Sequence, residues 1–464
     1  MQKLFYRLTL TGFYVFLDCV CIFGSVFAAY GIYHLLGMGK GVTYPAAALV
    51  PFTVGLAALC CVCMALFGAY RRESGILNVL EVRGVILGIL VCFAVTNTFF
   101  FAVRFPPSRY IVVMALLFML VLLPLARSIL YVFLEGRLPE ASLRRIMIYG
   151  AGRLGQRLFR EIHNSPRMQV KVCGFIDDDP QKMGACIAPS GFQTANHCQV
   201  LGGREDIPRL VREHGIDEIY LAISDIDNEN FKALSELCRN LGVAVAFVPG
   251  LHEVFTHRVK LEQVGNLPLV REHRFTWSRR AEWGKRIMDL ALASALGIVL
   301  FPVMAVIAVA VKFDSPGPAL FRQKRVGKGG KVFHIYKFRT MVTDAPRYAV
   351  NPLTHDDPRI TRVGRFLRRT SFDELPQILN VLRGEMSFVG PRPEMPFIVE
   401  QYDDTHRERL HALPGITGLW QLSGDRSKAI HENMDYDLYY IYNRSFFLDL
   451  TILLQTVIFA CRGI

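Results

Sequence analysis

The chain has 464 residues, enough for about three domains. Its hydrophobic fraction is 52%, its mean hydropathy is +0.29 and its formal net charge is +13. This basic, apolar balance favours an anionic membrane face or anionic substrates, the long apolar runs argue against nucleic acid as a partner, and the scattered cysteines exclude a disulfide framework or a paired zinc site.

Residues 1–140 contain four apolar runs, each long enough to cross a hydrocarbon core of about 30 Å as a helix. The runs lie at 8–36, 45–67, 84–103 and 110–134. Lys and Arg number eight at the two ends and in the second connection, against three in the first and third connections. This bias predicts that both ends of a four-helix transmembrane bundle are cytoplasmic. Asp18 and Arg127 fall inside the runs, where helix-end snorkelling or one buried pair accounts for them.

Residues 141–252 alternate between strand and helix patterns. An apolar segment is followed by a loop with Gly150, Gly152 and Gly155, a helix, and a second apolar segment at 170–176 that ends in three aspartates. This order is typical of a dinucleotide-binding unit. Further strands are expected at 219–223 and 243–248, with helices near 205–214 and 229–241.

The glycines of this loop have two interpretations. They can cradle a nucleotide, but they also serve tight turns and close helix–strand packing. The chain has no Tyr-x-x-x-Lys pair, which short-chain sugar epimerases and dehydratases use for hydride chemistry. We therefore expect a Rossmann-like parallel α/β domain that acts as a scaffold or regulatory unit, rather than an occupied nucleotide site.

Residues 253–280 are predicted to be a basic linker with a hairpin, and 281–464 a mostly helical domain. This domain begins with a fifth apolar run, Leu290 to Val311, with basic residues on both flanks. Pro302, near the middle of the run, removes a helical hydrogen bond and bends the axis. Because both flanks should be cytoplasmic, we expect a re-entrant membrane helix over 285–313. A spanning helix kinked at Pro302 is the alternative.

Residues 333–341 alternate like a strand, which places Lys337 and Arg339 on one face, where they could meet phosphate oxygens or simply be exposed. Farther along, five arginines between 359 and 369 precede the adjacent acids Asp373 and Glu374. Pro376 predicts that a helix starts near Asp373, where the helix dipole would hold a carboxylate ionised. An apolar helix face follows, formed by Leu375, Ile378, Leu379 and Leu382.

Two carboxylates ringed by cations suggest a site that handles phosphate, with a divalent metal between acid and substrate. The alternative is structural: Asp373 is an N-cap, Glu374 is a first-turn acid and the arginines form a solvated face.

Five motifs in residues 279–464, in their order along the chain, resemble the bacterial polyprenyl-phosphate sugar-1-phosphate transferases. The motifs are KRIMD at 285–289, YKFRTM at 336–341, SFDELPQ at 371–377, SFVGPRP at 387–393 and PGITG at 414–418. These monotopic phosphoglycosyl transferases start capsule, exopolysaccharide and O-antigen assembly. The four-helix and Rossmann-like units resemble the large members, which transfer glucose or galactose phosphate. One departure is Phe301-Pro302, where smaller members often have Ser-Pro.

The resemblance implies that Asp373 attacks the β-phosphorus of a UDP-sugar, releases UMP and passes the phosphosugar to polyprenyl (undecaprenyl) phosphate. It implies Mg²⁺ at Asp373 and Glu374, the latter for metal or proton handling. The implied phosphate-binding residues are Lys337, Arg368 and Arg392, with Arg339 and Asp357 as further candidates. It also implies a catalytic domain on the cytoplasmic face of the inner membrane and a homodimer through the middle domain.

Two other functions stay open at this point. A membrane-bound NAD-dependent sugar-nucleotide dehydratase shares the layout of four helices and a Rossmann-like domain, although the missing Tyr-x-x-x-Lys counts against it. A non-enzymatic regulator of polysaccharide assembly would leave Asp373 and Glu374 without a chemical role.

Overall fold

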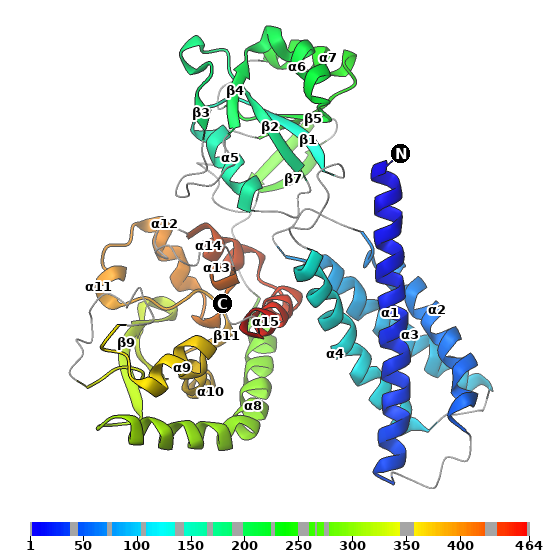
Figure 1. Cartoon of the computed structure of the whole chain (residues 1–464), viewed down its shortest axis with the longest axis vertical. Coiled ribbons are helices and arrows are strands. Elements are labelled where there is room, and N and C mark those ends of the chain that lie inside the picture. Colours follow the sequence, from blue (N-terminus) through cyan, green and yellow to red (C-terminus); the bar gives the residue numbers. More distant parts are fainter. Residues whose placement is uncertain are drawn as a thin grey trace. The chain divides into compact units, whose positions relative to one another are not determined.

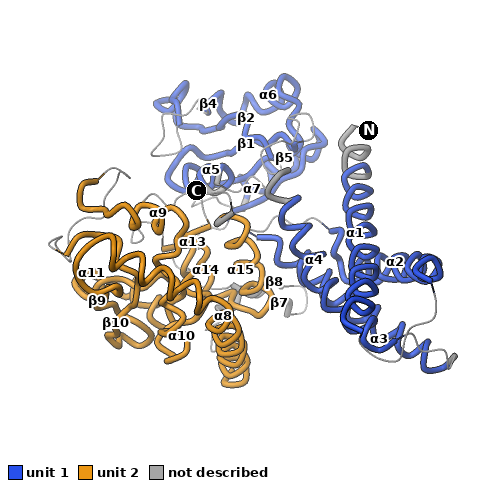
Figure 2. Tube along the Cα trace, turned by 60° about the horizontal axis from the view of Figure 1, so that its bottom comes forward, with its two compact units in different colours: residues 1–256 blue, residues 257–464 orange. Residues whose placement is uncertain are grey.

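The computed structural model describes residues 2–37, 45–71, 77–103, 108–134, 143–164, 170–187, 198–223, 228–248, 259–264, 267–272, 278–343, 357–422 and 434–461. Contacts divide the chain into two compact units, Met1–Thr256 and His257–Ile464 (Figure 2). Of the predicted linker at 253–280, the structure describes 259–264, 267–272 and 278–280.

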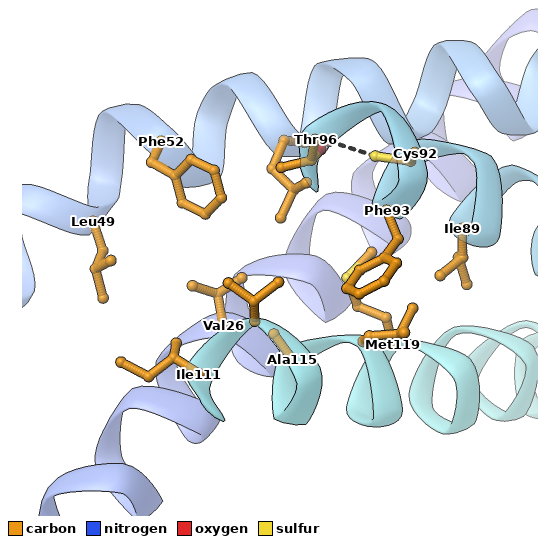
Figure 3. A pocket seen from close by; sticks show the side chains of 13 residues that line it. Val26, Leu49, Phe52, Ile89, Cys92, Phe93, Thr96, Ile111, Ala115 and Met119 are labelled. Atoms are coloured by element: carbon orange, nitrogen blue, oxygen red, sulfur yellow. Dashed lines mark hydrogen bonds between the residues drawn. The ribbon is translucent and has the colours of Figure 1, made fainter. Parts of the chain in front are cut away.

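The four N-terminal apolar runs are helices. They are α1 (Gln2–Leu35), α2 (Leu49–Leu66), α3 (Val79–Val103) and α4 (Arg109–Leu134). All four are long and apolar enough to cross a membrane. They pack on buried side chains such as Ile22, Met64, Ile89 and Leu123, and residues from all four line an apolar pocket (Figure 3). Many outward-facing side chains are also apolar, as lipid-facing helices require.

Asp18 and Arg127 form the buried pair that was one of the two sequence interpretations. Their side chains are 1% and 2% exposed, and Arg127 Nε donates to Asp18 Oδ1 at 2.9 Å. The same guanidinium donates to the Ala69 carbonyl at 2.7 Å, and the Tyr70 hydroxyl donates to Asp18 Oδ2 at 2.7 Å. The pair therefore ties α1 and α4 to the segment that follows α2.

The rest of the first unit is a parallel α/β sheet, as its strand and helix patterns predict (Figure 1). Its strands are β1 (Arg144–Tyr149), β2 (Val170–Ile176), β3 (Cys186–Ile187), β4 (Cys198–Gly202), β5 (Glu218–Leu221) and β6 (Ala244–Phe247), and its helices are α5 (Arg153–Asn164), α6 (Ile207–His214) and α7 (Asn228–Asn240). The strand order is β3-β4-β2-β1-β5-β6, and β3 alone among these described strands pairs antiparallel. Neither β3 nor β4 was predicted from the sequence.

The second unit begins with the predicted hairpin, β7 (Val259–Val264) and β8 (Leu267–Glu272), which pair antiparallel. The long helix α8 (Arg279–Asp314) follows, and the Ser278 side chain caps it by accepting from Ala281 N–H. Pro302 lies inside α8, and Figure 1 shows the helix as two arms set at an angle. Few of its residues are buried, although its apolar stretch is long enough to cross a membrane.

The remaining elements follow α8 along the chain. They are the antiparallel pair β9 (Leu320–Val326) and β10 (Val332–Phe338), α9 (Arg362–Thr370), the 3₁₀ helix η8 (Phe372–Gln377), α10 (Ile378–Arg383), the parallel pair β11 (Ser387–Val389) and β12 (Gly415–Thr417), α11 (Pro396–Val399), α12 (Asp404–Arg407), η9 (Glu408–His411), α13 (Leu419–Leu422), α14 (Met434–Asn443) and α15 (Phe446–Cys461).

One predicted helix face is only partly buried. Ile378 is 5% exposed, but Leu379 is 42% and Leu382 is 37% exposed. The inward positions are taken by Val381 and Asn380, both fully buried. The apolar period indicated the helix correctly, and Leu375 and Ile378 lie inward as predicted, but Leu379 and Leu382 lie on the surface.

Candidate active site

Asp373 and Glu374 lie in the first turn of η8, immediately after a sharp change of chain direction. Ser371 ends α9 in the left-handed conformation, with φ of 57°, and η8 begins at Phe372, close to the helix start that Pro376 predicted. The 3₁₀ helix then continues into α10. This turn presents two adjacent carboxylates at the end of a helix that carries several arginines.

Both acids line a cleft of about 1380 Å³. All four predicted phosphate-binding residues, Lys337, Arg339, Arg368 and Arg392, also line it. Arg359, one of the five arginines predicted around the two acids, also lines the cleft. Further basic residues there had no predicted role at the site: Lys312, Arg322, Lys324 and Arg325. The fold thus brings residues from β9, β10, α9, η8 and the loop after β11 to one strongly basic surface.

Glu374 is an ionised carboxylate paired with a lysine. Its Oε1 lies 2.6 Å from Lys337 Nζ, and the two side chains are 22% and 20% exposed. Burial alone would raise the pKa of Glu374, but the charges of Lys337 and Arg392 outweigh it and lower that pKa. Glu374 is therefore ionised at neutral pH and already paired with a cation.

Asp373 has a different environment. Burial raises its pKa to about 6, and the negative charge of Glu374 adds to this, while Lys337 and Arg368 oppose it. The helix start was expected to favour ionisation, but burial outweighs that effect. Within the described part of the chain, no other side chain donates a hydrogen bond to this carboxylate. Asp373 is thus largely ionised at pH 7 but poorly solvated, which suits a nucleophile.

Two of the candidate cations face the cleft in different ways. Arg368 Nε donates to Thr340 Oγ1 at 3.0 Å, and burial lowers the pKa of its guanidinium. Arg392 lies over the Trp420 ring, with its Cζ 5.7 Å from the ring centroid. These contacts orient both guanidinium groups and leave other donor nitrogens for a ligand.

Arg339 is oriented differently from the strand-face prediction. Strand β10 ends at Phe338, and the Arg339 side chain donates to carbonyl oxygens near the end of α8: Ser315 at 2.7 Å, Val311 at 3.4 Å, and Pro316. It is 6% exposed. We assign Arg339 to holding the end of α8, rather than to phosphate. The carboxylate of Asp357, a further candidate, forms an ion pair with Arg359 at 2.6 Å.

Asn380 is a supporting residue that the sequence analysis missed. Its side chain is fully buried; its oxygen accepts from Tyr336 N–H at 3.1 Å and its nitrogen donates to the His334 carbonyl at 2.7 Å. This fixes α10 against β10, the strand that carries Lys337. Its position in the apolar helix pattern, where Asn is unexpected, was the signal available in the sequence.

The residues present fit a magnesium ion. The described residues contain no group of three or more His, Cys, Asp or Glu that could hold a metal. Mg²⁺, however, is commonly bound by one or two carboxylates together with substrate phosphates and water. Asp373 and Glu374 supply such a pair beside the cationic cleft.

The glycine loop of the first unit is explained largely by packing. A Cβ on Gly155 would lie 1.8 Å from the Gly150 carbonyl oxygen, and one on Gly150 would lie 2.5 Å from that of Ala222, whereas one on Gly152 would meet nothing. The loop's Ala151 N–H donates to the Asp177 carboxylate at 2.7 Å. An acid of the chain itself therefore occupies this donor of the loop.

Comparison with known proteins identifies the chain. Residues 280–463 match the family described as bacterial sugar transferase, and residues 65–249 match a CoA-binding domain family. The UDP-glucose:undecaprenyl-phosphate glucose-1-phosphate transferase of Xanthomonas campestris pv. campestris is 30% identical, over 86% of this chain and 84% of its own. The chain belongs to the bacterial sugar transferase family.

Two other relatives of this bacterial sugar transferase agree. The Escherichia coli K12 protein with the same name as the Xanthomonas enzyme is 33% identical, over 69% of each chain. The undecaprenyl-phosphate galactose phosphotransferase of Salmonella typhimurium LT2 is 30% identical, over 75% of this chain and 74% of its own. The prediction of a polyprenyl-phosphate sugar phosphotransferase is thereby confirmed.

Proposed function

We propose that the enzyme transfers a hexose-1-phosphate from a UDP-sugar to undecaprenyl phosphate through a covalent intermediate on Asp373. The observation that carries this proposal is the position of the half-buried Asp373 carboxylate in a cleft lined by basic side chains, where burial raises its pKa to about 6. The names of the relatives support this donor class and acceptor.

In the first step an Asp373 carboxylate oxygen attacks the β-phosphorus of the donor. A phosphorus–oxygen bond forms to Asp373, and the bond from that phosphorus to the bridging oxygen breaks. The bridging oxygen leaves with UMP. Lys337, Arg368 and Arg392 offset the negative charge of the transferring group and of the leaving phosphate.

In the second step an oxygen of undecaprenyl phosphate attacks the same phosphorus. The bond to Asp373 breaks, the carboxylate is regenerated and a lipid diphosphosugar forms. No oxidant or further co-reactant is needed. Because the two half-reactions share one phosphorus and one set of cations, a single cleft can serve both.

Magnesium, held by Asp373, Glu374 and donor phosphate oxygens, would supply charge neutralisation when bound. The chain's own residues do the remaining work. Lys337 keeps Glu374 ionised, and partial burial reduces the hydration of Asp373. The Thr340 hydroxyl orients Arg368.

The proposed topology has α1 to α4 spanning the inner membrane and α8 re-entering from the cytoplasmic face. The basic flanks of α8, its internal Pro302 and its two arms in Figure 1 support this topology. The cleft would then meet UDP-sugar from the cytoplasm and the lipid phosphate at the headgroup level.

The test uses membranes and a UDP-sugar labelled in the β-phosphate. We expect labelled lipid and free UMP from the wild-type protein, and neither from Asp373→Asn that is inserted normally. Mass spectrometry of enzyme incubated with donor alone should find a sugar phosphate on the Asp373 peptide. Oxidised sugar nucleotide would indicate a dehydratase instead, and no turnover would indicate a regulator.

A further inference from the structure

The loop that carries Arg392 cannot hold itself in place by a regular main-chain ladder. It follows β11 and reads Gly390-Pro391-Arg392-Pro393, so two of its four residues lack an N–H group. Pro391 and Pro393 are buried while the Arg392 side chain is partly exposed and lines the cleft. Buried carbonyl groups of such a loop need donors from elsewhere.

Those donors come from several parts of the chain. The Arg409 side chain donates to the Arg392 carbonyl at 3.1 Å, and Arg325 donates to the Pro393 carbonyl at 3.1 Å. The Pro391 carbonyl accepts from Gly415 N–H at 2.9 Å. Hydrogen bonds thus hold the main-chain carbonyl groups of three consecutive residues, Pro391, Arg392 and Pro393.

Arg409, the donor to the Arg392 carbonyl, is unusual because it is both charged and buried. It is 3% exposed and forms an ion pair with Asp437, 2% exposed, at 2.6 Å. It also donates to the Tyr402 hydroxyl. A buried ion pair contributes little net stability compared with apolar residues of similar volume, because both charges lose their hydration. A gain in stability therefore does not account for this pair. The hydrogen bond from the Arg409 guanidinium to the Arg392 carbonyl does account for it.

We propose that Arg409 is a positioning residue, which acts through the Arg392 main chain to hold the Arg392 guanidinium in the cleft against the donor's diphosphate. Asp437 orients Arg409 and balances its charge. This inference rests on the proposed function in one respect, namely that Arg392 binds donor phosphate. It adds that the binding depends on a buried pair outside the cleft lining.

The test replaces the pair by apolar residues and asks whether the effect passes through Arg392. The double variant Arg409→Met/Asp437→Leu removes both charges together, so we expect its thermal midpoint to stay near that of the wild type. Its kcat/KM for UDP-sugar should fall about 10- to 100-fold, the loss typical of a misplaced binding group. UDP binding, measured by calorimetry, should weaken in parallel.

Activity loss alone would not separate positioning from a general structural role, so the decisive step is a double-mutant cycle. In an Arg392→Ala background, the same pair of substitutions should change kcat/KM and UDP affinity less than twofold, because no guanidinium remains to be positioned. If the double variant does not fold, Arg409→Lys replaces it in the same double-mutant cycle, because lysine keeps the charge but lacks the planar guanidinium.

The inference is overturned if the apolar pair retains wild-type kcat/KM and UDP affinity, or if the loss is equally large in the Arg392→Ala background. It is also overturned if Arg392→Ala alone leaves UDP affinity unchanged. Failure of the proposed function has a different signature, since the wild-type protein would then release no UMP from UDP-sugar.

Discussion

Replacing Lys337 by methionine should move the pH dependence of the first chemical step. Asp373 must be ionised to attack, and the rate of UMP release at low donor concentration reports the free enzyme before Mg²⁺ and donor bind. In that state the pKa of Asp373 is about 6, so this rate should fall about tenfold between pH 7 and pH 5. Lys337 lowers the pKa of Asp373, and losing a nearby cation raises a carboxyl pKa by roughly one unit or more. In Lys337→Met the midpoint of the acidic limb of the pH–rate profile should therefore move from about pH 6 to about pH 7.

The assay measures the burst of UMP from enzyme and UDP-sugar without undecaprenyl phosphate. Omitting the acceptor matters because a phosphate monoester has its own second pKa near 6, whereas the diphosphate diester of the donor does not titrate there. Lys337→Arg, which keeps the cation, is the matched control and should leave the limb near pH 6. A limb that stays in place in Lys337→Met, or moves to lower pH, would refute the assignment of Asp373 as the titrating nucleophile.

Three further predictions concern other parts of the chain. Asp18→Asn should lower the free energy of unfolding in detergent by about 3–5 kcal/mol, because Arg127 is left buried without its counter-charge; a destabilisation below 1 kcal/mol would show that the pair is dispensable. Gly155→Ala should yield little folded protein, since its Cβ would lie 1.8 Å from a carbonyl oxygen, while Gly152→Ala, which meets nothing, should express normally; equal yields would contradict the packing role. Chelation with EDTA should stop UMP release and added Mg²⁺ should restore it, and full activity after exhaustive chelation would remove the metal from the proposal.

Local patterns predicted the elements well where one period dominates. The strand expected at 170–176 is β2 with the same bounds, and the four apolar runs and the basic-flanked run around Pro302 are long helices. Asp373 and Glu374 could be located because a proline and adjacent acids mark a helix start. These features depend on neighbours within one or two turns, which a sequence displays directly.

Features that depend on distant contacts were harder to predict. Strand alternation put Lys337 and Arg339 on one face, but the strand ends at Phe338 and the end of α8 binds the second cation. The apolar period likewise did not reveal that Leu379 lies on the surface while Asn380 is buried. In each case a hydrogen-bond requirement elsewhere in the fold decided the orientation.

The two buried ion pairs illustrate why such contacts escape sequence reasoning and yet matter. Asp18 and Arg127 were noticed because charges stand out within apolar runs, whereas Arg409 and Asp437 lie in polar segments, where charges are unremarkable. Both pairs are almost completely buried, and both use the guanidinium to bind a main-chain carbonyl that lacks another described donor, at Ala69 and at Arg392. A planar fork can neutralise a carboxylate and still satisfy a carbonyl, which lysine does less well. This shared geometry is the physical reason to expect that Arg409 positions the chain beside it, and not merely that it fills the core.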